Sequence, residues 1–176
     1  YEELYKIVQN VQKSMVTVTE VNQDVDWFNN AYENKGQYQG IIFANSKTQI
    51  YVLLDSLDIA SAEEITVTFK DGSSTPGTYL QHDMNLGLSV VSVNLSDISE
   101  ETMDEIGVIG LGSSRSSGML ASPMIAIGKV FGDTDSVAYG MITAENTILN
   151  MTDCNYELLT TDIYGSETAS GFVVNT

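Results

Sequence analysis

The pattern of hydrophobic and polar residues changes from helical to alternating near Ser14. In the first twelve residues, YEELYKIVQNVQ, apolar side chains such as Leu4, Val8 and Val11 recur at the spacing of one helix face. The next segment, SMVTVTEV, alternates instead, which is typical of a strand with one buried face. We therefore expect a short N-terminal helix or arm over residues 1–13 and β-structure from residue 14 onward.

Short β-like runs then follow at regular intervals, separated by turn signals such as Asp71-Gly72 and Pro76-Gly77. They form two groups of about six runs, with no long helix. Antiparallel barrels or sandwiches fit this pattern better than a parallel α/β fold. The first group is SMVTVTEV, QGIIFAN, QIYVLLD, EITVTFKDG, PGTYLQHD and LSVVSVNL. The second group is IGVIGLG, PMIAIGKVFG, SVAYGMIT, ILNMTD, YELLTTDIYG and SGFVVN.

Two segments between the runs carry separate expectations. Residues 22–37 are rich in Asn, Asp and Tyr without a clear period, so we expect a long loop in which Trp27 and Phe28 anchor against the core. Residues 96–104, SDISEETMD, suit a capped helical turn or a linker. The expected organisation is an N-terminal helix or arm (1–13), a first barrel (14–95), a linker (96–104) and a second barrel (105–176).

Composition and charge exclude several classes of function. The chain has 7 Lys+Arg against 24 Asp+Glu, a net charge of −17, so its surface repels phosphate, and we expect neither nucleic-acid binding nor docking on anionic lipid. One Cys makes no intrachain disulfide, and one His leaves a single candidate for imidazole chemistry. No apolar run approaches the roughly 20 residues of a membrane helix. We expect any leader or anchor to lie outside these 176 residues.

Four segments, in this order, resemble trypsin-like proteases of the HtrA/DegP type. Residues 39–73 resemble the opening glycine strand, the strand that runs into the histidine turn, and a strand ending in Asp-Gly. HDMNLGLSVVSVN resembles the segment that carries the aspartate. SPMIAIGKVFGDTDSVAYGMIT, with IGVIGLGSS ahead of it, resembles the family's hairpin, with Gly128, Gly132, Val137 and Gly140 in register. TTDIYGSETASGFVVN resembles the loop and strand that present the nucleophile. The shared order and spacing argue against a chance match.

This resemblance implies an all-β, trypsin-like fold of two six-stranded antiparallel barrels. It also implies a further hairpin after the nucleophile strand, so we expect the second barrel to be incomplete at its C-terminal end. A fragment, a chain lacking its end and a barrel completed by another chain remain open as explanations. An uncovered strand edge would favour association.

The resemblance also assigns positions to the catalytic residues. Such a protease needs a serine nucleophile, a histidine base and an aspartate that orients the imidazole. The histidine position falls on Leu57, the aspartate position on Gly87 and the nucleophile position on Ala169. None of these side chains accepts a proton, carries a charge or attacks a carbonyl. A shift of one residue at the first position gives Ser56 or Asp58, and neither is an imidazole.

The turn that forms the oxyanion hole in the family is altered as well. Glu167 stands where glycine is usual, two residues before the nucleophile position, and Thr168 follows it. A carboxylate there opposes developing negative charge, and a side chain restricts the positive φ that glycine permits. The resemblance therefore implies a pseudoprotease, a homologue without peptidase activity, metal or cofactor.

Other residues could carry chemistry in alternatives that stay open. In one alternative, Ser170 is a displaced nucleophile, although the favoured interpretation is a turn serine with a local backbone hydrogen bond. Its base would be His82, expected to be exposed at a strand end away from the histidine turn, or a lysine such as Lys47 or Lys70. Cys154 is expected to be a buried, inert thiol on a strand of the second barrel.

The acidic clusters are expected to be solvated. Calcium at the Asp133–Asp135 turn is the alternative, with suitable oxygens and too few ligands. The clusters are Asp133/Asp135, Glu100/Glu101 and Glu63/Glu64.

These observations favour a catalytically silent, HtrA-like module that binds peptide or protein, or regulates a partner. The resemblance implies an extracytoplasmic place in a bacterial cell envelope, with an anchor or PDZ domain elsewhere in the protein. The interbarrel cleft would hold a peptide or an unfolded protein segment by strand addition. One alternative is an active endopeptidase that uses Ser170. The other is a purely structural assembly domain, in which Leu57 and Ala169 pack together and no peptide binds.

Overall fold

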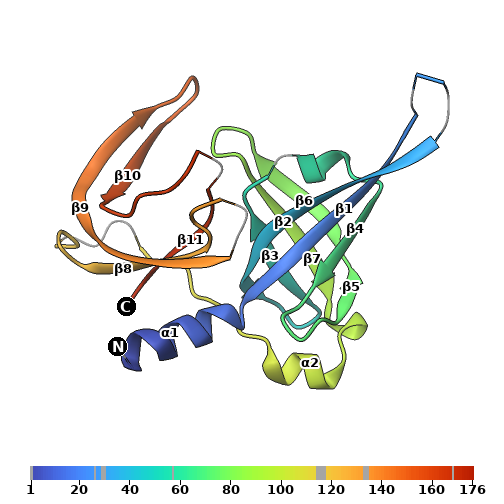
Figure 1. Ribbon diagram of the computed structural model, residues 1–176, viewed down its shortest axis with the longest axis horizontal. Coiled ribbons are helices and arrows are strands. Elements are labelled where there is room, and N and C mark those ends of the chain that lie inside the picture. Colours follow the sequence, from blue (N-terminus) through green and yellow to red (C-terminus); the bar gives the residue numbers. More distant parts are fainter. Residues whose placement is uncertain are drawn as a thin grey trace. The chain divides into compact units, whose positions relative to one another are not determined.

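The computed structural model of the chain describes residues 2–25, 27–28, 31–56, 58–113, 118–132, 135–167 and 169–176. The chain divides into two compact units (Figure 1). We call them the N-terminal unit, Glu2–Gly110, and the C-terminal unit, Leu111–Thr176.

The N-terminal unit is built on one antiparallel sheet of order β5-β4-β1-β2-β3-β7-β6. A helix over the residues expected from the sequence precedes it, and short helical segments interrupt and follow it. The elements are α1 (Glu2–Gln12), β1 (Met15–Val25), β2 (Ala31–Asn45), β3 (Gln49–Leu54), η1 (Asp58–Ser61), β4 (Glu64–Thr68), β5 (Ser74–Pro76), β6 (Thr78–Asp83), β7 (Leu88–Asn94), η2 (Leu95–Asp97) and α2 (Glu100–Glu105).

Gly77 closes this sheet into a barrel. It is the only residue between β5, which pairs with β4, and β6, which pairs with β7. The Gly77 amide also donates to the Ile65 carbonyl at 2.8 Å. A Cβ on Gly77 would lie 2.8 Å from Val91 Cγ1 and 3.0 Å from Ile65 Cγ2, so glycine fits this crowded seam. With β5 and β6 taken as one strand, the barrel has the six strands expected for the first group.

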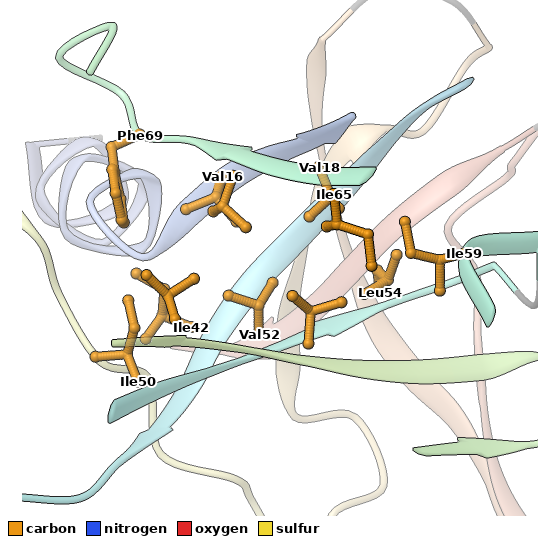
Figure 2. Close-up of a cluster of buried hydrophobic side chains, with 12 residues drawn as sticks. Val16, Val18, Ile42, Ile50, Val52, Leu54, Ile59, Ile65 and Phe69 are labelled. Carbon is orange, nitrogen blue, oxygen red and sulfur yellow. The ribbon is translucent and has the colours of Figure 1, made fainter. Parts of the chain in front are cut away.

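The barrel interior holds a continuous apolar cluster, shown in Figure 2. It arises because apolar side chains alternate along each strand, as in β3, where every second residue is buried. Gly40 makes room for this packing, since a Cβ there would lie 2.6 Å from Val52 Cγ1. The buried members are Val16, Val18, Ile42, Ile50, Val52, Leu54, Ile59, Ile65, Val67, Phe69, Val91 and Val93.

Segment 96–104 forms a capped helical turn, one of its two predicted forms. Ser99 is the N-cap of α2, and its hydroxyl accepts from the Thr102 amide at 3.2 Å. The buried Thr102 hydroxyl donates to Asp71 Oδ2 at 2.6 Å, which attaches α2 to the turn between β4 and β5. The hydrogen bonds from Thr102 and then Ser73 hold the pKa of Asp71 below its ordinary value.

The loop predicted for residues 22–37 is instead a two-stranded ribbon. β1 and β2 stay paired as far as Val25 and Ala31, and Figure 1 shows the ribbon continuing past the barrel. Its polar residues conceal the strand because a ribbon with two solvated faces needs no apolar alternation. Trp27 and Phe28 are 96% and 83% exposed at its tip, so the predicted anchoring against the core is wrong.

The C-terminal unit contains a second antiparallel sheet of order β10-β9-β8-β11. Its strands are β8 (Pro123–Lys129), β9 (Ser136–Asn150), β10 (Asn155–Thr161) and β11 (Ser170–Asn175). The described residues of this unit contain four strands rather than the predicted six. The predicted runs SVAYGMIT and ILN join in the single long strand β9, and residues 106–112 form no strand.

The two sheets share one order of strands. In the N-terminal unit, β4, β1, β2 and β3 lie side by side, and in the C-terminal unit β11, β8, β9 and β10 do. Numbered within each unit, both orders read fourth, first, second, third. The C-terminal sheet is therefore a partial repeat of the barrel.

Candidate functional site

The N-terminal unit carries two of the three positions that the resemblance assigns to catalysis. In the sequence, one follows β3 and the other lies between β6 and β7, and the pairing of Leu54 with Ser89 sets the end of β3 beside the start of β7. The Ser89 hydroxyl also donates to the Ser56 carbonyl at 2.5 Å. Leu57, the expected histidine position, lies outside the described residues.

Gly87 occupies the expected aspartate position in a tight turn. The Asp83 side chain accepts from the amides of Asn85 at 2.9 Å and Leu86 at 3.1 Å, and Gly87 follows with a φ of +71°. Glycine adopts this left-handed conformation without strain. No carboxylate extends from position 87.

Asp55 is a neighbour of Gly87 that the sequence interpretation missed. Its Oδ1 atom would lie 3.8 Å from a Cβ built on Gly87, so an exposed carboxylate stands beside the expected aspartate position. In the sequence, the one indication of this carboxylate is that Asp55 directly follows the β-like run of β3. Only the pairing of β3 with β7 brings Asp55 close to Gly87. A carboxylate alone binds cations or hydrogen-bond donors. It does not replace the serine nucleophile of a serine protease.

His82 is exposed on β6, as the sequence predicted. The Tyr79 hydroxyl is hydrogen-bonded to its Nδ1 atom, and the two rings stack with centroids 6.1 Å apart. The imidazole is thus engaged by a residue of its own strand.

The C-terminal unit carries the expected nucleophile position. Ala169 is exposed directly before β11, and its amide donates to the Ser166 carbonyl at 3.0 Å. The Ser166 amide donates in turn to the Val130 carbonyl at 3.3 Å. Glu167 is exposed in this turn, and Thr168 lies outside the described residues. The turn therefore presents a methyl group and a carboxylate.

Ser170 is the first residue of β11, half-buried and paired with Lys129. The neighbouring contact between the two strands is very close, because a Cβ on Gly171 would lie 2.6 Å from the Ile127 carbonyl oxygen. Gly128, opposite Gly171, has a φ of +128°. The strand pairing fixes the Ser170 backbone in β11, beyond the turn that precedes this strand.

Cys154 differs from its predicted environment. It is exposed and lies in the turn between β9 and β10, where its carbonyl accepts from the Met151 amide at 2.9 Å. The predicted buried thiol on a strand is therefore wrong. β9 and β10 meet in a hairpin, with Asn150 paired to Asn155, and its turn contains the cysteine.

The remaining charged candidates lie at the surface. Lys47 and Lys70 are exposed, and Lys70 Nζ donates to Gln12 Oε1 at 2.5 Å. Across the residues that the structure describes, no three His, Cys, Asp or Glu side chains gather as a metal site. Asp133 lies outside that part of the chain. Glu63, Glu64, Glu100, Glu101 and Asp135 are all exposed, in agreement with solvated clusters.

A search for membrane-spanning segments adds one negative finding. Within the described ranges, none of the helices has the length and apolar character needed to cross a membrane.

Of three comparisons with known proteins, one finds similar structures. No family model matches the chain, and no curated protein does. Among solved structures, the chain is similar to the HtrA-type protease AlgW with decapeptide, with a TM-score of 0.67 and 19% identity over 96% of this chain and 54% of that one. It is similar to AlgW with tripeptide at a TM-score of 0.67 and 20% identity, over 97% of this chain and 50% of that one.

The chain thus spans about half the length of these relatives. At this level of identity the likeness concerns the fold, and it agrees with the closed barrel and its partial repeat. The chain has the trypsin-like, double β-barrel fold of the HtrA-type proteases.

Proposed function

We propose that this chain is a non-catalytic HtrA-type domain that binds peptide or protein segments, or regulates a partner, in the envelope of a bacterium. The observation that carries the proposal is Ala169, an exposed methyl side chain in the turn that the resemblance assigns to the nucleophile. An alanine forms no acyl-enzyme, so covalent catalysis has no starting point here.

The other two positions support the same conclusion. Position 57 is leucine, which takes no proton from a nucleophile, and position 87 is glycine. The Asp55 carboxylate beside Gly87 orients nothing without an imidazole at position 57. Loss of a complete serine-protease triad lowers kcat by about a millionfold.

The proposed binding role is supported by the AlgW structures, which contain a decapeptide and a tripeptide. A fold that keeps its strand edges after losing the triad retains main-chain groups for strand addition. Because the chain spans about half of AlgW, the role of the whole protein is part of this proposal.

Labelling with a fluorophosphonate probe tests the loss of catalysis. We expect neither labelling nor hydrolysis of fluorogenic peptides above a heat-denatured control. The matched variant is Ser170→Ala, which should behave as the unchanged chain does. Hydrolysis that disappears in Ser170→Ala would contradict the proposal and favour an active endopeptidase with a displaced triad.

Restoring the three side chains tests the assignment of positions. The variant Leu57→His/Gly87→Asp/Ala169→Ser, with Glu167→Gly to free the turn, is expected to gain fluorophosphonate labelling. Aspartate at position 87 is tolerable because Asp enters the left-handed region more readily than most residues. The control is the same variant without Ala169→Ser, which should stay unlabelled. Labelling of both variants would show that the nucleophile is elsewhere.

Peptide binding separates this function from a purely structural domain. Fluorescence anisotropy with a labelled unstructured peptide library should detect saturable binding. A structural domain would show none, while leaving the labelling results unchanged.

A further inference from the structure

Strand β9 has one side that is only partly covered. It pairs with β8 over residues 136–141, and on its other side with β10 from Ile142 onward. Met141 lies opposite Pro123, which has no N–H, and the Met141 amide donates instead to Asp162 Oδ1 at 2.7 Å on the other side. Alternate residues of a strand direct their backbone groups to the same side. The N–H and C=O groups of Val137 and Tyr139 therefore face away from β8.

The neighbouring chain leaves β9 before it reaches these residues. The Asp162 amide donates to the Met141 carbonyl at 3.2 Å, and the chain then crosses the sheet at Gly140. A Cβ on Gly140 would lie 2.6 Å from Ile163 Cγ1, so glycine makes this crossing possible. Within the described part of the chain, no strand pairs with Val137 or Tyr139 on this side. We call residues 135–141 the β9 edge.

The side chains of the β9 edge form an exposed apolar row. Val137, Tyr139 and Met141 alternate along the strand, so they lie on one face of the sheet, and they are 44%, 60% and 45% exposed. Apolar side chains next to backbone groups that no described strand pairs with form a surface on which an added strand gains both hydrogen bonds and apolar burial.

Charge defines the partner further. Exposed carboxylates stand at both ends of the β9 edge, Asp135 before β9 and Asp162 beside Met141. The chain as a whole has a net charge of −17, which repels acidic segments and attracts basic ones.

We propose that the β9 edge binds an extended segment of a partner protein, with apolar side chains at alternate positions and basic residues at both ends, as an added strand. This site is separate from the three positions assigned to catalysis. The inference rests on the binding role of the proposed function and names a site and a partner chemistry for it, while its occupancy does not depend on whether the chain cleaves peptides.

A designed probe tests the site. It is the labelled peptide Lys-Lys-Val-Thr-Val-Thr-Val-Lys-Lys, titrated against the whole chain by fluorescence anisotropy and by amide NMR. We expect chemical-shift changes centred on residues 135–141 and slower exchange of the Val137 and Tyr139 amides. Two control peptides, one with Glu in place of each Lys and one with N-methyl groups on the valines, should bind about tenfold more weakly or not at all.

Variants of the chain distinguish the β9 edge from other surfaces. Tyr139→Pro removes an N–H that serves no bond to β8, and Tyr139→Thr keeps the backbone while trimming the apolar row. Each should weaken binding of the probe about tenfold. Ile148→Thr is the matched control. The Ile148 side chain is 61% exposed on the same strand, but there the strand is already paired with β10. That control should bind as the unchanged chain does.

Four results would overturn the proposal. They are no binding at millimolar peptide, shifts centred on the turns at 83–89 or 164–170, unchanged affinity in both Tyr139 variants, and self-association that disappears in Tyr139→Thr. The last would identify a second copy of the chain as the occupant. The hydrolysis and labelling assays remain a separate readout, so failure here leaves the assignment of positions 57, 87 and 169 intact.

Discussion

The closed barrel and its partial repeat place similar valines in very different environments. Val67, on the fourth strand of the barrel, pairs with Val18 of the first strand and is fully buried. Val173, on the fourth strand of the C-terminal sheet, pairs with Ala126 of the first strand and is 51% exposed. In the barrel, β5 and β6 bridge from β4 to β7, and the described C-terminal residues contain no such bridge. Closure of the sheet decides burial here, and residue type does not.

The largest expected difference is in the response to truncation of these two valines. Val67→Ala leaves a cavity in a sealed core and should lower the free energy of unfolding by about 2–3 kcal/mol. Val173→Ala should lower it by less than about 1 kcal/mol, since half of its side chain is already in water. Urea unfolding followed by circular dichroism measures the change in the free energy of unfolding for both variants. Hydrogen exchange shows in which unit each change occurs. Equal losses would mean that Val173 is covered in solution.

A substitution at Gly77, where the barrel closes, should lower the stability of the N-terminal unit by nearly as much. Gly77→Ala places a methyl group 2.8 Å from Val91 Cγ1 and should destabilise the N-terminal unit by about 1–3 kcal/mol. Gly110→Ala is the control, because no atom lies within 4 Å of a Cβ there. Thermal unfolding compares the two. If Gly77→Ala is neutral, β5 and β6 do not form one continuous closing strand.

A smaller effect is expected where α2 attaches to the barrel. Ser99→Ala removes the hydroxyl that accepts from the Thr102 amide, a loss of about 1 kcal/mol for a helix N-cap. Ser99→Asp should restore most of it. Hydrogen exchange should locate the change in residues 96–106 and leave the C-terminal sheet as it was. A change in β8 or β9 would contradict the separation of the two units.

The smallest effect is a pH dependence from Asp71. Because hydrogen bonds from Thr102 and Ser73 lower its folded pKa, the stabilisation is present above the ordinary carboxyl value and lost as pH falls through the folded value. Asp71 is fully exposed, so the change is small. Unfolding of the chain and of Asp71→Asn, compared from pH 5 to strongly acidic pH, should converge at the acidic end. Parallel curves would exclude a contribution from this carboxylate.

Much of the fold was predictable from local pattern. The β-like runs QIYVLLD and LSVVSVNL predicted β3 and β7, and the segment SDISEETMD predicted a capped helical turn or a linker. The ribbon at residues 22–37 was not, because both of its faces meet water and its pairing leaves no apolar signal. The same limit applies to Cys154, whose exposure depends on where the β9–β10 hairpin turns.

The candidate site divides in the same way. The residues at positions 57, 87 and 169 follow from the order of four sequence segments. The positive φ of Gly87 and the Asp55 carboxylate beside it depend on the pairing of β3 with β7, between residues more than 30 positions apart.

By itself, the sequence determined that the chain is all-β, strongly acidic, and supplied with leucine, glycine and alanine at the positions that the resemblance assigns to catalysis. Those properties belong to residue types and local periodicity. Tertiary structure alone decided that one sheet closes at Gly77 and that, among the described residues, no strand covers the side of β9 at Val137 and Tyr139 that faces away from β8. Both depend on which distant backbone segments share hydrogen bonds, and no local pattern of side chains encodes that choice.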